Sequence, residues 1–184
     1  NAIGGNPDAL AEVIAEVIQA HANTTHLTRL VKEVLAMALT MDVDGTPTPF
    51  IDPDAVHYMG ISNGATFGAL HVATSPQIER AVLSLGDGGL FHFLERAADW
   101  NGFSVVFDVL YEDPRDLQLF LSIAQLQTDP IDTMSFARRL IHDRFPGMGP
   151  LKAQLHMAVH DSQMRNLATE WVARTAGVPL VTPS

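Results

Sequence analysis

The sequence predicts a mixed α/β domain built on a parallel sheet, and three strand patterns lead to that prediction. Ala55 to Met59 is a short run with β-branched and aromatic members that stops at a glycine and continues into the helical pattern of residues 67–72. Arg80 to Leu85 and Lys152 to Val159 are the next two strands expected. Helical patterns separate the three strands, and parallel neighbours need such crossover connections. We therefore expect a parallel sheet of about four strands.

Two amphipathic helices are expected before the first strand. Asn6 can cap the first helix with Pro7 in its first turn, and apolar residues then recur at helical spacing as far as Ile18. After the polar stretch of residues 22–25, a second apolar stripe covers residues 27–38. Both helices should bury one face.

Two features near these helices have more than one interpretation. His21 and His26 lie at the expected junction, where solvated or capping histidines are a more common arrangement than a metal-binding pair. Asp42 to Pro49 is similar to the start of a calcium loop, but the later acidic ligands are missing. We therefore expect a turn there, and no metal or cofactor is predicted.

A glycine-flanked serine lies where the first strand meets its helix, in the motif Gly60-x-Ser62-x-Gly64. A side chain is held at the tip of so tight a turn when its neighbours two positions away carry no Cβ to collide. Gly68, one helical turn further on, would let the helix approach the sheet closely. The Ser62 hydroxyl would project at a helix start, where backbone N–H groups lack partners. The motif predicts a nucleophile, although it also occurs by chance in glycine-rich loops.

These residues resemble the α/β-hydrolase superfamily, and more narrowly secreted bacterial lipase or esterase-like proteins. The resemblance runs through residues 51–64, 80–89 and 159–169, and so covers most of the chain after residue 50. It implies a three-layer α/β sandwich, of which residues 1–184 would be one partial domain from the centre and C-terminal end. It also implies a serine esterase or lipase, a small-molecule ester or lipid substrate, and a secreted or cell-envelope location.

In that superfamily the catalytic residues follow in the order serine, acid, histidine. The resemblance implies that Ser62 is the nucleophile, that Asp161 is the acid orienting the base, and that the Asn63 backbone N–H is one donor of the oxyanion hole. Asp161 at a strand end can also be a turn or cap residue. Asp87, between glycines after the second strand, is a turn residue or an acid of the site.

The chain departs from the superfamily pattern in two places. There is no histidine between Ser162 and Ser184, and two helices stand where earlier strands would be, so the base histidine is unknown. Three interpretations follow. The remaining segment of the enzyme or a companion chain supplies the base; or His156, His160 or another internal histidine completes a rearranged triad; or the chain is a non-catalytic binding or structural module.

Residues 90–145 are predicted to be a helical insertion between strands, rich in large apolar groups. By resemblance they form a cap over the site with apolar side chains facing an acyl group; the alternative is helices that cover the sheet. Asp132 is a plausible N-cap of the helix starting at Thr133. A helix from Asn166 to Thr175, ended by Gly177, and a short strand at residues 179–181 complete the prediction.

Composition limits the classes of partner. The 184 residues carry a net charge of −10 and no cysteine. An acidic chain without basic clusters repels phosphate backbones, so no nucleic-acid partner is expected. No apolar run approaches the roughly 20 residues that span a bilayer. The chain begins with Asn1 and has no signal-peptide pattern, so we expect that an upstream part has been removed.

Overall fold

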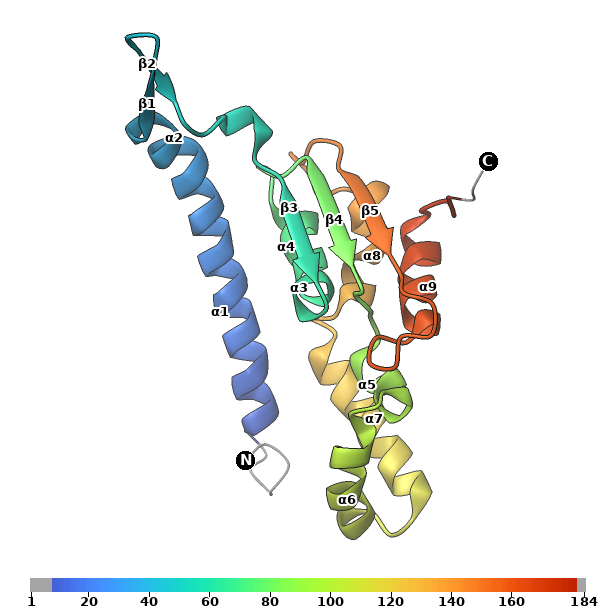
Figure 1. The fold of residues 1–184 in the computed structure, drawn as a ribbon. Helices are drawn as coiled ribbons and strands as arrows, with labels where there is room; N and C mark the ends of the chain where they lie inside the picture. Colours follow the sequence, from blue (N-terminus) through green and yellow to red (C-terminus); the bar gives the residue numbers. More distant parts are fainter. Residues whose placement is uncertain (1–7, 182–184) are drawn as a thin grey trace.

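A three-stranded parallel sheet is the centre of the computed structural model, which describes residues 8–181. Its strand order is β3 (Tyr58–Ile61), β4 (Arg80–Ser84) and β5 (Lys152–His156). The predicted parallel pairing is confirmed: β4 pairs with both neighbours and β3 lies at an edge (Figure 1). The expected strand at residues 179–181 is wrong, because that segment has no strand structure and Leu180 and Val181 are exposed.

Helices cover one face of this sheet. Tyr58, Leu83 and Leu155, which alternate toward that face, pack in the main core cluster with residues of the helices that follow each strand. Met59 and Ile61 on the opposite face are 66% and 56% exposed. Figure 1 looks onto this open face, with the helices behind the strands. The described residues therefore form two of the three expected layers.

The N-terminal region is one continuous helical rod, so the prediction of two helices is wrong. α1 (Ala9–Arg29) continues into a π-helical segment, η1 (Leu30–Leu35), and then into α2 (Ala36–Ala38). No glycine or proline interrupts residues 9–38, and the Thr24 hydroxyl in the polar stretch donates to the carbonyl of Ala20 at 2.8 Å. A threonine bonded inside its own helix no longer favours a break. The expected cap residues Asn6 and Pro7 lie outside the described residues.

The predicted turn after this rod is the tip of a β-hairpin. β1 (Thr40–Val43) and β2 (Thr46–Pro49) pair antiparallel around Asp44 and Gly45, whose φ angles are 53° and 80°. Asp-Gly with two positive φ angles matches the tight turn that suits a two-residue hairpin. A single 3₁₀ turn, η2 (Pro53–Ala55), follows. Strand β3 consequently begins at Tyr58, later than the predicted Ala55, and continues to Ile61.

The helical insertion divides into two parts. α5 (Leu90–Phe93), η3 (Leu94–Arg96), α6 (Trp100–Leu110) and α7 (Pro114–Thr128) carry a separate aromatic cluster. In it Phe107 contacts Trp100 and Phe120 with ring centroids 5.5 Å apart in both pairs. The described helices α5 to α7 thus bury apolar groups against one another. α8 (Thr133–Ile141) instead contributes Ala137 and Leu140 to the core over the sheet.

Two helix predictions at the C-terminal end of the chain are confirmed. The Asp132 carboxylate caps α8 by accepting from the Met134 N–H at 2.7 Å. α9 (Asn166–Ala176) ends at Gly177, which has the left-handed φ of 71° typical of a helix C-terminus. α9 also contributes Val172 to the core beneath the sheet.

Candidate functional site

Ser62 lies at a sharp turn between β3 and the helix α3 (Asn63–Thr66). We call residues 58–74 the elbow, with β3 as the elbow strand and the following helix α4 as the elbow helix. Its backbone has φ 55° and ψ −124°, a region that non-glycine residues avoid. The Ser62 N–H donates to the Ser84 carbonyl of β4 at 2.9 Å, and the Ser62 carbonyl accepts from Ala65 N–H at 2.8 Å and Thr66 N–H at 3.0 Å. These bonds at both ends hold the strained residue in place. A strained serine between strand and helix is the arrangement that presents a nucleophile.

The glycines around the turn have unequal roles. A Cβ added to Gly60 would lie 2.1 Å from the Gly64 carbonyl oxygen, and one added to Gly86 would lie 2.7 Å from the Ala65 Cβ. A Cβ on Gly64, by contrast, would meet no atom within 4 Å. The expectation that clearance requires both flanking glycines is therefore confirmed for Gly60 and wrong for Gly64 among the described residues.

The helix α4 (Gly68–Thr74) lies close against the elbow strand, as predicted from Gly68. A Cβ at Gly68 would lie 2.3 Å from the Tyr58 hydroxyl oxygen of β3. That hydroxyl donates to the Gly64 carbonyl at 2.7 Å. Burial raises the pKa of Tyr58, which keeps its hydroxyl protonated as the donor. The strand and the start of the helix are thus tied together by one side chain.

Asp87 connects the loop after β4 to α3. The Thr66 hydroxyl donates to the Asp87 carboxylate at 2.9 Å, and the Asp87 N–H donates to the same hydroxyl oxygen at 3.1 Å. Burial raises the pKa of Asp87; the bond from Thr66 opposes this shift, and the negative charges of Asp132 and Asp161 add to it. Of the two interpretations left open from the sequence, this geometry supports the structural turn residue.

Asp161 lies in the loop after β5, and Ser62 follows β3. The carboxyl ends of these two strands lie at the same edge of the sheet (Figure 1). Its Oδ1 accepts from the Gln163 N–H at 2.9 Å and the Met164 N–H at 3.1 Å. The carboxylate is partly exposed, and its negative charge contributes to the raised pKa of Asp87. Its second oxygen, Oδ2, has no hydrogen bond among those found for the described residues.

The histidines considered as bases are not brought to this pair. His156 ends β5 and is exposed. His160 has a φ of 63°, and its N–H donates to the Asn166 side chain at 2.9 Å. Within residues 8–181 no hydrogen bond joins a histidine to Ser62 or to Asp161. The base therefore stays unassigned, and Asn63, exposed as the first residue of α3, stays the expected oxyanion donor.

Asp132 has a structural role larger than the predicted cap. It is fully buried, and besides Met134 it accepts from the Gly89 N–H at 2.9 Å and the Leu90 N–H at 2.8 Å. The Gln125 side chain donates to it at 3.0 Å. One carboxylate thus satisfies the starts of both α5 and α8. The sequence signal for its cap role was its place before Thr133; the remaining partners are distant in sequence.

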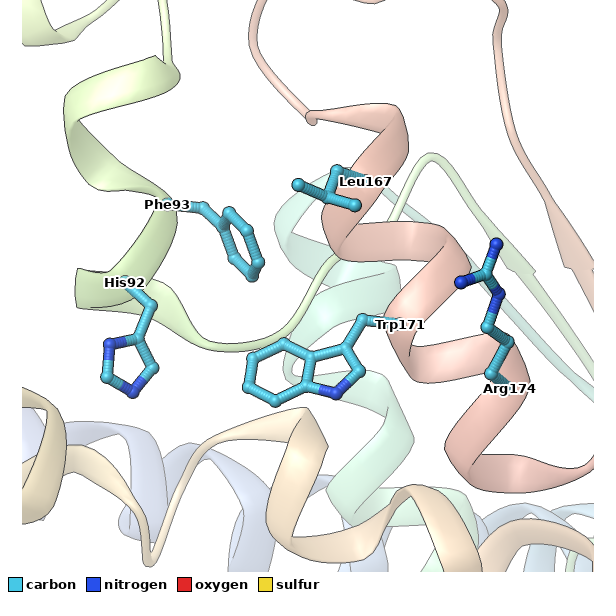
Figure 2. A pocket seen from close by; sticks show the side chains of 5 residues that line it. All are labelled: His92, Phe93, Leu167, Trp171 and Arg174. Atoms are coloured by element: carbon cyan, nitrogen blue, oxygen red, sulfur yellow. The ribbon is translucent and has the colours of Figure 1, made fainter.

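A cavity of about 410 Å³ lies between α5 and α9 and was not predicted from the sequence. Leu167, Trp171 and Arg174 line it from α9, and His92 and Phe93 from α5; Figure 2 shows the indole extending toward α5. The Phe93 and Trp171 rings meet edge-on with centroids 5.6 Å apart. Leu167 and Trp171 are 48% and 40% exposed.

In the described part of the chain no three histidine, cysteine or acidic side chains group as metal ligands would. No helix there has the length and apolar character to cross a membrane. Comparison of the chain with protein-family models, with curated proteins and with solved structures finds no match.

Proposed function

We propose that this chain carries the nucleophile of a serine hydrolase that cleaves carboxylic esters through an acyl-enzyme. The observation that carries the proposal is the strained backbone of Ser62, φ 55° and ψ −124°, at the carboxyl end of β3 and the start of α3. Strain of this kind persists only where the surrounding structure enforces it, and it gathers at functional sites. The sequence resemblance to α/β-hydrolases supports the same conclusion.

The chemistry of such a site assigns a step to each residue. A base removes the hydroxyl proton of Ser62 while the Ser62 Oγ attacks the ester carbonyl carbon. The oxyanion of the resulting tetrahedral intermediate accepts a hydrogen bond from the Asn63 N–H. The base then protonates the departing alcohol and an acyl-serine remains. Water, deprotonated by the same base, attacks the acyl carbon, and the base returns this proton to the Ser62 Oγ as the acyl–oxygen bond breaks and the acid leaves. Asp161 would accept from the base imidazole and stabilise its cation.

The missing base is best supplied from outside the described residues. β3 pairs only with β4, so the backbone N–H and C=O groups of Met59 and Ile61 on its other edge have no strand partner within residues 8–181. The side chains of both residues are also exposed. An edge of this kind supports the interpretation that the remaining segment of the enzyme, or a companion chain, adds a strand there and brings the histidine.

A non-catalytic module is the second candidate, and one observation favours it. Ser62 has no histidine partner among the described residues, and a serine without a base is a weak nucleophile. On this interpretation the strained turn persists as a way to pack β3 against α3 and α4. The rearranged triad of His156 or His160 has less support, because neither side chain contacts Ser62 or Asp161 in the hydrogen bonds described.

Labelling by a fluorophosphonate probe separates these possibilities. We expect Ser62 to be labelled when the companion segment is present and Ser62→Ala to abolish both labelling and ester turnover, lowering kcat by about four to six orders of magnitude. Ser84→Ala, at the end of the neighbouring strand, is the matched control and should keep both. Labelling of the chain alone would support a rearranged triad. No labelling in either state would support the non-catalytic module and contradict the proposal.

A further inference from the structure

α1 rests on the elbow helix α4 through a narrow contact. Of the residues of α1, Ala9 and Thr28 are buried, while Ile18 and Leu27 are 49% and 56% exposed. Because α1 buries little apolar surface, its docking on the rest of the chain is weakly stabilised by the hydrophobic effect. Each polar contact between α1 and α4 therefore contributes a large part of the docking free energy.

Two histidines meet at this contact. His21 of α1 and His71 of α4 lie edge-on with ring centroids 5.5 Å apart, and His71 is only 3% exposed. The Tyr58 ring of the elbow strand lies 5.4 Å from His71 on another side. A cavity of about 140 Å³, lined by both imidazoles, Tyr58 and Gly64, separates the rod from the elbow here. The pair therefore joins α1 to the structure that holds Ser62.

Threonine hydroxyls fix which ring nitrogen carries the proton. The Thr74 hydroxyl donates to the backbone carbonyl four residues earlier at 2.7 Å, so its oxygen can only accept from His21 Nε2 at 3.1 Å. Thr28 likewise donates to the carbonyl four residues earlier at 2.9 Å and faces His71 Nε2 at 3.5 Å. This arrangement suits the neutral tautomer of each ring that carries its proton on Nε2 and leaves Nδ1 unprotonated.

Both Nδ1 atoms are buried and have no hydrogen-bond partner among the described residues. Protonation would place there a donor without an acceptor and a positive charge beside a second imidazole, and both changes are costly in a buried contact. No carboxylate in residues 8–181 is hydrogen-bonded to either ring. The docked arrangement thus tolerates the neutral pair and disfavours the charged one.

The other polar groups around the pair do not offset a new charge. The Tyr58 hydroxyl is already used as a donor to Gly64, and the buried Ser75 hydroxyl makes no hydrogen bond in the described structure. Arg144 donates from the α8 side to the α4 carbonyls of Val72 and Ala73 at 3.1 and 3.3 Å, so it adds positive charge. At the far end of the contact, Lys32 donates to the Gln77 carbonyl at 3.0 Å, and Glu33 accepts from the Gln77 side chain at 3.2 Å.

We propose that the His21–His71 contact is an acid-sensitive latch, which holds α1 against the elbow helix while both imidazoles are neutral and releases it when they bind protons. The latch concerns the docking of α1 and does not depend on whether Ser62 is catalytic. Its release would expose the cavity and the side of the elbow formed by Tyr58 and Gly64.

The direction of the pH dependence follows from burial. Burial lowers the pKa of His71 to about 4, with repulsion from His21 as a second cause, and burial also lowers the pKa of His21. The released state, with both rings in water, takes up protons near the ordinary histidine pKa of 6.5. Docking is therefore fully favoured above that pH, weakens as the pH falls toward about 4, and changes no further below.

A distance measurement between two spin labels tests the latch, and the absence of cysteine makes the labelling specific. Ala15→Cys on α1 and Ser135→Cys on α8 are both at exposed positions. In the full chain we expect one narrow distance distribution at pH 7.5. A second, broader population should grow as the pH falls from 6.5 toward 4 and reverse on neutralisation. A single unchanged distance throughout this range would overturn the proposal.

Matched substitutions test whether His21 and His71 cause the pH dependence of α1 docking. His21→Phe with His71→Phe keeps both rings but removes both proton sites, and Thr28 and Thr74 keep their bonds to backbone carbonyls. This double variant should stay docked at acid pH, whereas His26→Phe, at an exposed position of the same helix, should titrate like the natural chain. A double variant that titrates like the natural chain overturns the latch. If α1 of the double variant is already released at pH 7.5, the single variants His21→Phe and His71→Phe give the test. A released population that rises less steeply as the pH falls supports the latch, and an unchanged pH dependence refutes it.

Discussion

The turn at Ser62 and the loop at Asp161 leave the same edge of the sheet, but they are held in different ways. Ser62 is fixed by contacts from several elements: a bond to β4, the close approach of Gly60 to Gly64, and the Tyr58 hydroxyl across the turn. The Asp161 carboxylate is held by the N–H groups two and three residues further on, and the carbonyl of the next residue, Ser162, accepts from the distant Ala98 N–H at 2.9 Å. The first geometry is imposed by packing, and the second is a local turn.

This difference affects what each residue can do alone. A strained serine that packing enforces is presented in the same way whether or not a ligand is bound. An aspartate in a local turn is placed at the right edge of the sheet, but its orientation toward a base requires that base to be present. If the proposed hydrolase function holds, the difference predicts that Ser62 is preorganised within this chain and that Asp161 acts only once the base is present.

The largest expected effect is on ester turnover, and it tests whether Asp161 is the acid of the proposed triad. Asp161→Asn keeps an oxygen for the Gln163 and Met164 N–H groups, so the loop should fold normally. An amide cannot stabilise the imidazolium, and in serine triads this change lowers kcat by about 10⁴-fold. Steady-state ester hydrolysis by the assembled enzyme measures the effect. Asp99→Asn, at an exposed helix start, is the control. A kcat within about tenfold of the natural value would identify Asp161 as a turn residue only.

A smaller effect, on stability, tests how the serine turn is held. Gly60→Ala places a Cβ against the Gly64 backbone, which cannot move aside easily, and should lower the free energy of unfolding by about 3 kcal/mol. Gly64→Ala meets open space inside α3, where alanine is the better helix former, and should change stability by less than about 1 kcal/mol. Urea unfolding of the two variants gives the comparison. Equal losses would mean that packing does not single out Gly60.

The same difference explains how much could be predicted from the sequence. The parallel strands, the elbow, the close approach at Gly68 and the caps at Asp132 and Gly177 depend on residues adjacent in sequence, so local patterns indicate them. The Asp-Gly hairpin had such a signal, but it was interpreted only as a turn. The predicted break between two N-terminal helices was wrong because polar residues alone do not end a helix: residues 9–38 contain no glycine or proline, and the Thr24 hydroxyl finds its partner within the helix.

What could not be predicted depends on distant contacts. The bonds of Asp132 to Gly89 and Leu90, the cavity at Trp171 and the His21–His71 contact each join segments that are far apart along the chain. No local spacing encodes such pairs. The open edge of β3 is a similar case, because it depends on the neighbour that the strand lacks among the described residues. The base histidine falls in this class as well, since the described residues bring none to Ser62.

The smallest expected effect concerns Asp87, in the loop after β4, which is hydrogen-bonded to Thr66 of the elbow. Burial raises the pKa of Asp87, and a carboxyl group with a raised pKa stabilises the fold below its unfolded pKa and loses that contribution as the pH rises through the folded pKa. Asp87→Asn keeps an acceptor for the Thr66 hydroxyl but has no charge. We therefore expect this variant to be more stable than the natural chain at pH 7, and the difference to shrink toward pH 4. Urea unfolding across this range measures it. If the variant is instead less stable at pH 7, the negative charge of Asp87 stabilises the elbow, and the expected unfavourable effect of burying this charge is wrong.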